Sequence, residues 1–145
     1  MDILSKLENG FLFFDGGMGT LLQERGLSAG EAPESWNITH PDEITAIHRA
    51  YFEAGANVVT TNTFGANPLK SENVEDIVCR AVQNAKNAIF APEQYVALDI
   101  GPTGKLLKPL GELDFEDAVK SFAETVKAGV KAGCDLIIIE TMNDP

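Results

Sequence analysis

The segment Asp15-Gly16-Gly17-Met18-Gly19-Thr20 combines one carboxylate with three glycines, and it directly follows an apolar run at 11–14. Glycine permits positive φ and a close approach of the backbone to a ligand. Backbone N–H groups and the Asp15 carboxylate can therefore converge on one small molecule. The segment is a candidate binding loop.

Polar side chains also follow three later apolar runs. Glu140 directly follows the run 136–139, and an acid in that position is seldom buried without a partner. Asn62 and Thr63 follow the run 58–61, where they either line a pocket or hydrogen-bond neighbouring loops. Asp99 follows the run 95–98, where it either faces a ligand or fixes the glycine-rich turn 101–104. All four runs thus deliver polar residues at their carboxyl ends.

Helical patterns separate these four runs. They cover 41–54, 71–91 and 114–132, ended by Gly55, Pro92 and Gly133, and Asp114 is the expected N-cap of the third. The expected buried faces are Ile44, Ile47, His48, Tyr51 and Phe52; Val74, Ile77, Val78, Ala81, Val82, Ala85 and Ile89; and Phe115, Ala118, Val119, Phe122, Val126 and Val130. The order βαβαβαβ predicts an α/β fold with a parallel sheet, which binds ligands at the carboxyl ends of its strands.

The spacing of the runs decides between two parallel architectures. They begin near residues 11, 56, 95 and 136, and eight such units would need about 300 residues, as in a TIM (β/α)8 barrel. An open doubly wound sheet fits 145 residues better, but the loop lacks the third glycine of the dinucleotide fingerprint and the chain has no phosphate loop. We therefore expect the first half of a barrel, strands 1–4, over residues 1–145.

Composition narrows the partners and the compartment. With 22 acidic and 11 basic residues, the net charge of −11 disfavours binding to nucleic acid or an anionic membrane surface. The chain shows no long apolar stretch and no secretory signal pattern, so we expect a cytoplasmic protein. We expect Cys79 and Cys134 to be inert structural thiols. We expect His40 to be a loop residue and His48 a helix-face residue, and neither to be a metal ligand. Residues 27–38 read as a long irregular connection.

Several motifs, in order along the chain, resemble the homocysteine S-methyltransferase family. They are DGGMGT at 15–20, NITHP at 37–41, AGAN at 54–57 and TNTFGAN at 61–67. Two more, GPTGKLL at 101–107 and IIIETM at 137–142, are most similar to the homocysteine-binding domain of the cobalamin-dependent methionine synthases. The resemblance covers essentially the whole chain.

The resemblance implies a TIM barrel in which three cysteines hold zinc. The metal binds the homocysteine sulfur, and the resulting thiolate attacks a methyl group, carried by methylcobalamin in the methionine synthases. The cysteine motifs of the family, Gly-x-Asn-Cys and Gly-Gly-Cys-Cys, do not occur here. We therefore expect the chain to be the N-terminal half of a homocysteine-binding barrel, inactive alone, with zinc and the methyl-donor domain or cofactor belonging to the parent protein.

The resemblance also assigns the amino-acid site. Asp15 and Glu140 correspond to the acids that hold the homocysteine ammonium group, and the amides of Gly16, Gly17 and Met18 would receive its carboxylate. Carboxylates suit an ammonium group, and convergent N–H donors suit a carboxylate. Asn62 is included as a pocket residue.

Two other functions compete with this assignment. A TIM-barrel lyase or aldolase could use Asp15 and Glu140 as acid and base, but it needs a Schiff-base lysine or a metal triad, and no lysine lies at the four strand ends. A non-catalytic half-barrel could act as a binding or assembly module. A half-barrel also has open strand edges and an exposed apolar sheet face, and both predict self-association of the chain.

Overall fold

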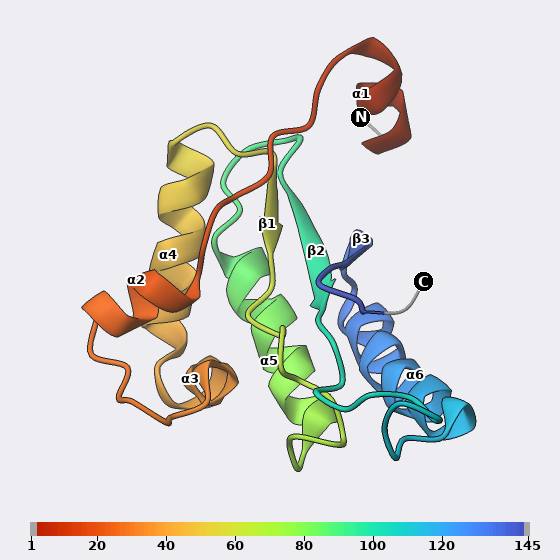
Figure 1. Ribbon diagram of the computed structural model, residues 1–145. Coiled ribbons are helices and arrows are strands. Elements are labelled where there is room, and N and C mark those ends of the chain that lie inside the picture. Colours follow the sequence, from red (N-terminus) through yellow and green to blue (C-terminus); the bar gives the residue numbers. More distant parts are fainter. Residues whose placement is uncertain (1–2, 144–145) are drawn as a thin grey trace.

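The computed structural model describes residues 3–143 and contains a parallel sheet of three strands. These are β1 (Val58–Thr60), β2 (Tyr95–Ile100) and β3 (Leu136–Ile139), in the order β1-β2-β3 (Figure 1). Val58 pairs with Tyr95 in the first ladder, and Ala97 pairs with Leu136 in the second. The predicted α/β class with parallel strands is confirmed.

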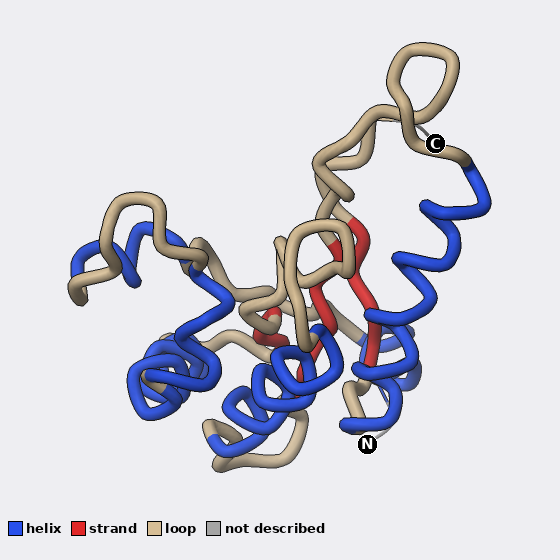
Figure 2. Tube along the Cα trace, turned by 90° about the horizontal axis from the view of Figure 1, so that it is seen from below, coloured by secondary structure: helices blue, strands red, loops and turns tan. Residues whose placement is uncertain are grey.

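Three helices pack along one side of this sheet (Figure 2). They are α4 (Pro41–Glu53), α5 (Val74–Asn87) and α6 (Phe115–Ala132), close to the ranges that the sequence predicts. Gly55 and Gly133 follow α4 and α6 with φ of +106° and +85°, a left-handed conformation that suits glycine. The core between helices and sheet contains Val59, Val78, Val82, Val96 and Leu98, all fully buried.

From residue 3 onward, four short helices lie before α4. They are α1 (Ile3–Asn9), α2 (Gly19–Glu24), the 3-10 helix η1 (Pro33–Ser35) and α3 (Trp36–Thr39). The expectation of an irregular connection at 27–38 is therefore wrong for its second half. Trp36 is buried there and stacks on the His40 ring at 4.0 Å, which anchors α3 beside α4 and α5. Packing of one aromatic residue overrides a loop-like local composition.

The apolar run 11–14 is not the fully buried strand that we expected. Only Phe14 forms a bridge, to Val58, and Phe11 and Phe13 are 81% and 63% exposed. The run lies beside β1 at the sheet edge, where the Phe13 carbonyl accepts hydrogen bonds from the amides of Asn57 and Val58. Within residues 3–143, no second strand pairs with the run. The three phenylalanines of the run are consequently exposed, whereas Leu12 is partly buried.

Three helix details differ from the prediction. Helix α5 ends at Asn87 rather than at 91, and Ile89, which was expected on its buried face, lies beyond the helix and is exposed. Helix α5 begins at Val74 rather than near Ser71, because Asn73 adopts a left-handed conformation that a helix cannot include. The buried face of α6 is made of small residues, and three residues expected on it are exposed, namely Phe115, Val119 and Val130. The reason is close packing, since a Cβ on Gly129 would lie 2.4 Å from Leu98.

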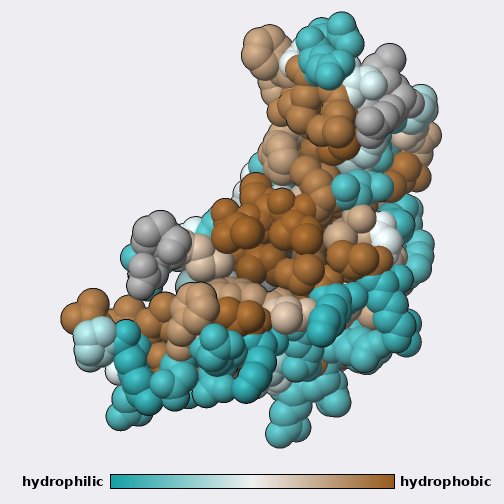
Figure 3. Space-filling view, turned by 90° about the vertical axis from the view of Figure 1, so that its right-hand side faces the viewer, coloured by the Kyte–Doolittle hydropathy of each residue, from teal (hydrophilic) through white to brown (hydrophobic). Residues whose placement is uncertain are grey.

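An apolar surface lies beyond β3 (Figure 3). Ile139 is 68% exposed, and Ile137 on the same strand is also exposed. In the described part of the chain, β3 pairs with β2 alone, so its outer edge has free backbone groups. No helix among residues 3–143 is both long and apolar enough to span a bilayer.

Candidate functional site

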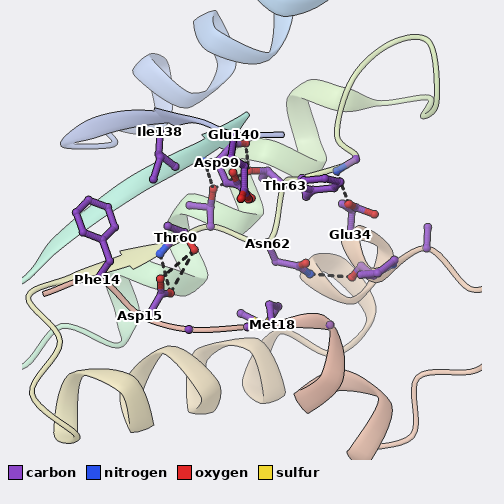
Figure 4. Close-up of a pocket in the computed structure, with 18 of the residues that line it drawn as sticks. Phe14, Asp15, Met18, Glu34, Thr60, Asn62, Thr63, Asp99, Ile138 and Glu140 are labelled. Carbon is purple, nitrogen blue, oxygen red and sulfur yellow. Dashed lines mark hydrogen bonds between the residues drawn. The ribbon is translucent and has the colours of Figure 1, made fainter. Parts of the chain in front are cut away.

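A cavity of about 750 Å³ opens at the carboxyl ends of the three strands (Figure 4). Its wall combines the loop 14–19, the start of η1 and the residues that follow β1. Asp99 near the end of β2 and Glu140 after β3 complete it. All six predicted binding residues line this cavity: Asp15, Gly16, Gly17, Met18, Asn62 and Glu140.

Asp15 is held in place by Thr60 at the end of β1. Its carboxylate accepts hydrogen bonds from the Thr60 amide at 2.8 Å and from the Thr60 hydroxyl at 3.1 Å. Burial raises the pKa of Asp15 to about 6, although the hydrogen bonds from Thr60 act in the opposite direction. The side chain is thus fixed at the cavity wall and is costly to ionise without a cation beside it.

The loop after Asp15 lines the cavity with three residues whose backbone amides are free within the described chain. In the described part of the chain, the amides of Gly16, Gly17 and Met18 donate no hydrogen bond. Neither Gly16 nor Gly17 has a positive φ, so the expectation that glycine is needed here for a left-handed backbone is wrong. Instead, the Tyr51 hydroxyl bonds to the Gly17 carbonyl at 2.6 Å, and a Cβ on Gly16 would lie 3.0 Å from that hydroxyl. Glycine is needed here for close approach to Tyr51.

Asp99 and Glu140 lie next to each other across the cavity from Asp15 (Figure 4). Burial, and after it the Glu140 carboxylate, raise the pKa of Asp99 well above its ordinary value. The Thr61 hydroxyl accepts from the Asp99 amide at 3.1 Å, and the Thr63 hydroxyl donates to the Asp99 carbonyl at 2.7 Å. Asp99 was expected either to face a ligand or to fix the turn 101–104. Because its side chain lines the cavity, the structure favours the first of these.

Asn62 lines the cavity and also serves a structural role. Its side-chain amide donates to the Pro33 carbonyl at 2.8 Å and to Asn37 Oδ1 at 3.2 Å. Asn37 returns a bond to the Asn62 carbonyl at 2.8 Å, and Asn84 of α5 donates to the Asn37 carbonyl at 3.0 Å. This asparagine network (Asn37, Asn62 and Asn84) joins the cavity wall to α5. Both readings of Asn62 hold at once.

Glu34 and Lys70 were missed by the sequence analysis. Glu34 is buried in the cavity wall, where its carboxylate accepts from the Gly65 amide at 2.5 Å. It belongs to a short 3-10 helix after Pro33, and no apolar run marks that position. Lys70 is an exposed residue of the cavity rim, ten residues after β1, so counting lysines at strand ends overlooked it.

The described residues do not fit the zinc ion that the family resemblance implies. Cys79 in α5 points to the Ala128 carbonyl at 3.8 Å, and Cys134 precedes β3, at the end of the sheet opposite the cavity. Burial raises the pKa of the Cys134 thiol, which disfavours the thiolate that a metal needs. Among residues 3–143, no three His, Cys, Asp or Glu side chains are arranged to hold a metal ion.

The comparisons with known proteins agree on one family. Residues 12–145 match the sequence model of homocysteine S-methyltransferase. The methionine synthases of Mycobacterium leprae (strain TN) and Mycobacterium tuberculosis (strain ATCC 25618 / H37Rv) are each 31% identical over 160 aligned residues. The alignment covers 99% of this chain and 13% of either relative.

Solved structures show the same fold. The metallated form of the homocysteine methyltransferase MmuM from Escherichia coli has a TM-score of 0.80 at 22% identity, over 94% of this chain and 56% of that one. Its apo form has a TM-score of 0.73 at 26% identity, over 95% and 52%. This chain thus spans about half of MmuM. Since its motifs, its family match over residues 12–145 and its α/β fold coincide, the chain belongs to the homocysteine S-methyltransferase family.

Proposed function

We propose that this chain provides the amino-acid-binding part of a homocysteine S-methyltransferase domain. The observation that carries the proposal is the meeting of Asp15 and Glu140 in one cavity, beside three amides without hydrogen-bond partners in the described chain. The two acids suit the ammonium group of an amino acid, and the amides of Gly16, Gly17 and Met18 suit its carboxylate.

In this proposal, the sheet is the first half of a (β/α)8 barrel. Its support is the overlay of 94% of this chain on 56% of MmuM, together with the unpaired outer edge of β3 in the described residues. The cavity then lies where barrel enzymes have their active sites, at the carboxyl ends of the strands. A second set of strands would cover the exposed apolar surface.

The methyl transfer itself is assigned to the parent protein. Family resemblance implies a zinc-activated homocysteine thiolate and, for the methionine synthases, methylcobalamin as donor. The two cysteines here lie away from the cavity, so we assign this chain no step of the transfer. Its own residues bind and orient homocysteine, with Asp15 held by Thr60.

Calorimetry with L-homocysteine tests the proposal. We expect saturable binding that weakens about tenfold or more in Asp15→Asn, because one charged hydrogen bond is lost. The deamino analogue 4-mercaptobutanoate lacks the ammonium group and should bind more weakly to the unmodified chain. Glu124→Gln, an exposed acid on α6, is the matched control and should bind homocysteine normally. Equal binding of both ligands would contradict the proposal.

A further inference from the structure

Asp99 has a carboxyl oxygen that nothing satisfies. The residue is only 6% exposed, and its Oδ1 is shut off from solvent without a hydrogen-bond partner in the described chain. The amide and the carbonyl of Asp99 bond to the hydroxyls of Thr61 and Thr63, which fix the backbone at this strand end. A buried, ionised carboxylate with an unpaired oxygen is unfavourable.

Glu140 is placed beside Asp99 by the sheet itself. Its amide donates to the Ile100 carbonyl at 3.1 Å, which extends the ladder between β2 and β3 by one residue. Figure 4 shows the two acidic side chains together at the cavity wall. Asp99 is buried, whereas Glu140 is exposed at the cavity wall. Two neighbouring carboxylates repel each other, and a single proton held between them removes that repulsion.

The other charged groups of the cavity do not supply a compensating cation at this pair. Asp15 and Glu34 add two acids whose charges act on Asp99 in the same direction as that of Glu140. Lys70, on the exposed rim, is the one basic residue that lines the cavity within residues 3–143. The site therefore has an excess of negative charge and a buried acceptor, which together fit a cationic ligand group.

We infer that Asp99 and Glu140 hold one proton between them in the free protein, and that the ammonium group of the bound amino acid takes the place of this proton. The displaced proton passes to the solvent, and no other bond forms or breaks. The pair changes from one negative charge to two, which the ligand cation balances. This inference rests on the proposed function and adds Asp99 to its binding residues.

Calorimetry in buffers with different ionisation enthalpies measures the released proton. At pH 7 we expect the enthalpy of homocysteine binding to vary with the buffer, with a slope that approaches one proton for each bound ligand. Asp99→Asn imitates the protonated acid, so it should bind about tenfold more weakly and release no proton. Glu124→Gln should release as much as the unmodified chain. A buffer-independent enthalpy in the unmodified chain would overturn the inference.

Carboxyl carbon NMR of the ligand-free chain provides an independent test. One carboxyl should remain protonated near pH 7. Its signal should vanish in Asp99→Asn, and its midpoint should move to lower pH in Glu140→Gln, which alters an exposed residue and removes the neighbouring charge. If all carboxyls are ionised at that pH, the inference fails. If homocysteine does not bind at all, the proposed function fails, whereas this titration still decides whether the pair shares a proton.

Discussion

The carboxylate of Asp15 and the amide and hydroxyl of Thr60 form a three-point contact across 45 residues of sequence, with N···O and O···O distances of 2.8 and 3.1 Å for the two closest bonds. Thr60 ends β1, and Asp15 follows the edge segment that bridges to β1 through Phe14. The orientation of Asp15, a predicted binding residue, thus depends on the side chain of another strand end (Figure 4).

Replacing Thr60 by valine should raise the pKa of Asp15 further above about 6. The hydroxyl bond stabilises the ionised carboxylate, and valine removes it while it keeps the amide bond and the branched shape. The free energy of unfolding should fall by about 1 kcal/mol. An NMR titration of the Asp15 carboxyl measures the shift. Thr39→Val, on an exposed residue, is the control, and an unchanged Asp15 midpoint would contradict the prediction.

Truncation of Glu140 to alanine should weaken homocysteine binding by about one to two orders of magnitude. A charged hydrogen bond to the ligand ammonium is worth about 1.5–3 kcal/mol, and alanine leaves that group without its partner. Calorimetry on the 145-residue chain measures the change, with Glu124→Ala as the control. Unchanged affinity in the Glu140 variant would remove this residue from the site.

His48 should make the fold sensitive to acid. It is fully buried in α4, neither ring nitrogen has a partner in the described chain, and burial lowers its pKa to about 4. The unfolded chain, with a histidine pKa near 6.5, binds the proton more tightly, so this contribution is complete above pH 6.5 and decreases as the pH falls toward 4. The loss should be about 3 kcal/mol over that range.

Denaturant unfolding of His48→Leu between pH 7 and 4 tests this expectation. The variant should lose less stability over the range than the unmodified chain does. Gln23→Leu, at an exposed residue that does not titrate, should keep the original slope. Asp15 and Asp99 act in the opposite direction, because their raised pKa values favour the folded state as the pH falls, so the comparison is between slopes. Parallel curves for His48→Leu and the unmodified chain would rule out the histidine effect.

Gly129→Ala should destabilise the chain although alanine is the better helix former. The new Cβ would lie 2.4 Å from Leu98 in the closed core, and overpacking of this kind costs about 1–3 kcal/mol. The helix-propensity gain of about 1 kcal/mol offsets only part of that cost. Gly19→Ala, where no atom lies within 4 Å, should be neutral or slightly stabilising. Thermal unfolding of both variants measures the contrast, which an equal response would contradict.

The chain should self-associate at micromolar concentration. The outer edge of β3 has no partner strand within residues 3–143, and Ile139 beside it is largely exposed. Unpaired edges and apolar patches drive association. Sedimentation velocity should show a dimer or larger species, and Ile139→Lys should shift it toward monomer. Glu124→Lys controls for the change of charge. A monomeric unmodified chain would show that this surface does not drive association.

The periodic part of the fold could be read from the sequence. Strand runs at 58–61, 95–98 and 136–139 and the three long helices repeat with regular spacing, and buried residues recur at helical intervals in α4 and α5. The six predicted binding residues meet in one cavity because parallel strands bring their carboxyl ends to one edge.

The other parts of the fold and of the candidate site depend on long-range contacts, which local sequence patterns do not contain. Whether the run 11–14 is buried depends on which other part of a protein covers it. The local sequence around Phe11 is the same for a covered and for an exposed run. The buried face of α6 is set by the close approach of Gly129 to Leu98, which favours small residues over the larger apolar ones. Glu34 reaches the cavity through a single turn of helix, for which hydrophobic periodicity provides no signal.

The asparagine network places an evolutionary constraint on three side-chain amides that bond to the protein itself. Asn37, Asn62 and Asn84 each donate through the side-chain NH2 group to a carbonyl oxygen. A carboxylate has the same shape but no such donor. Replacing one of these asparagines by aspartate would therefore leave a buried carbonyl unpaired and add a charge beside it. Sequences that descend from this one should therefore keep all three amides or replace them together.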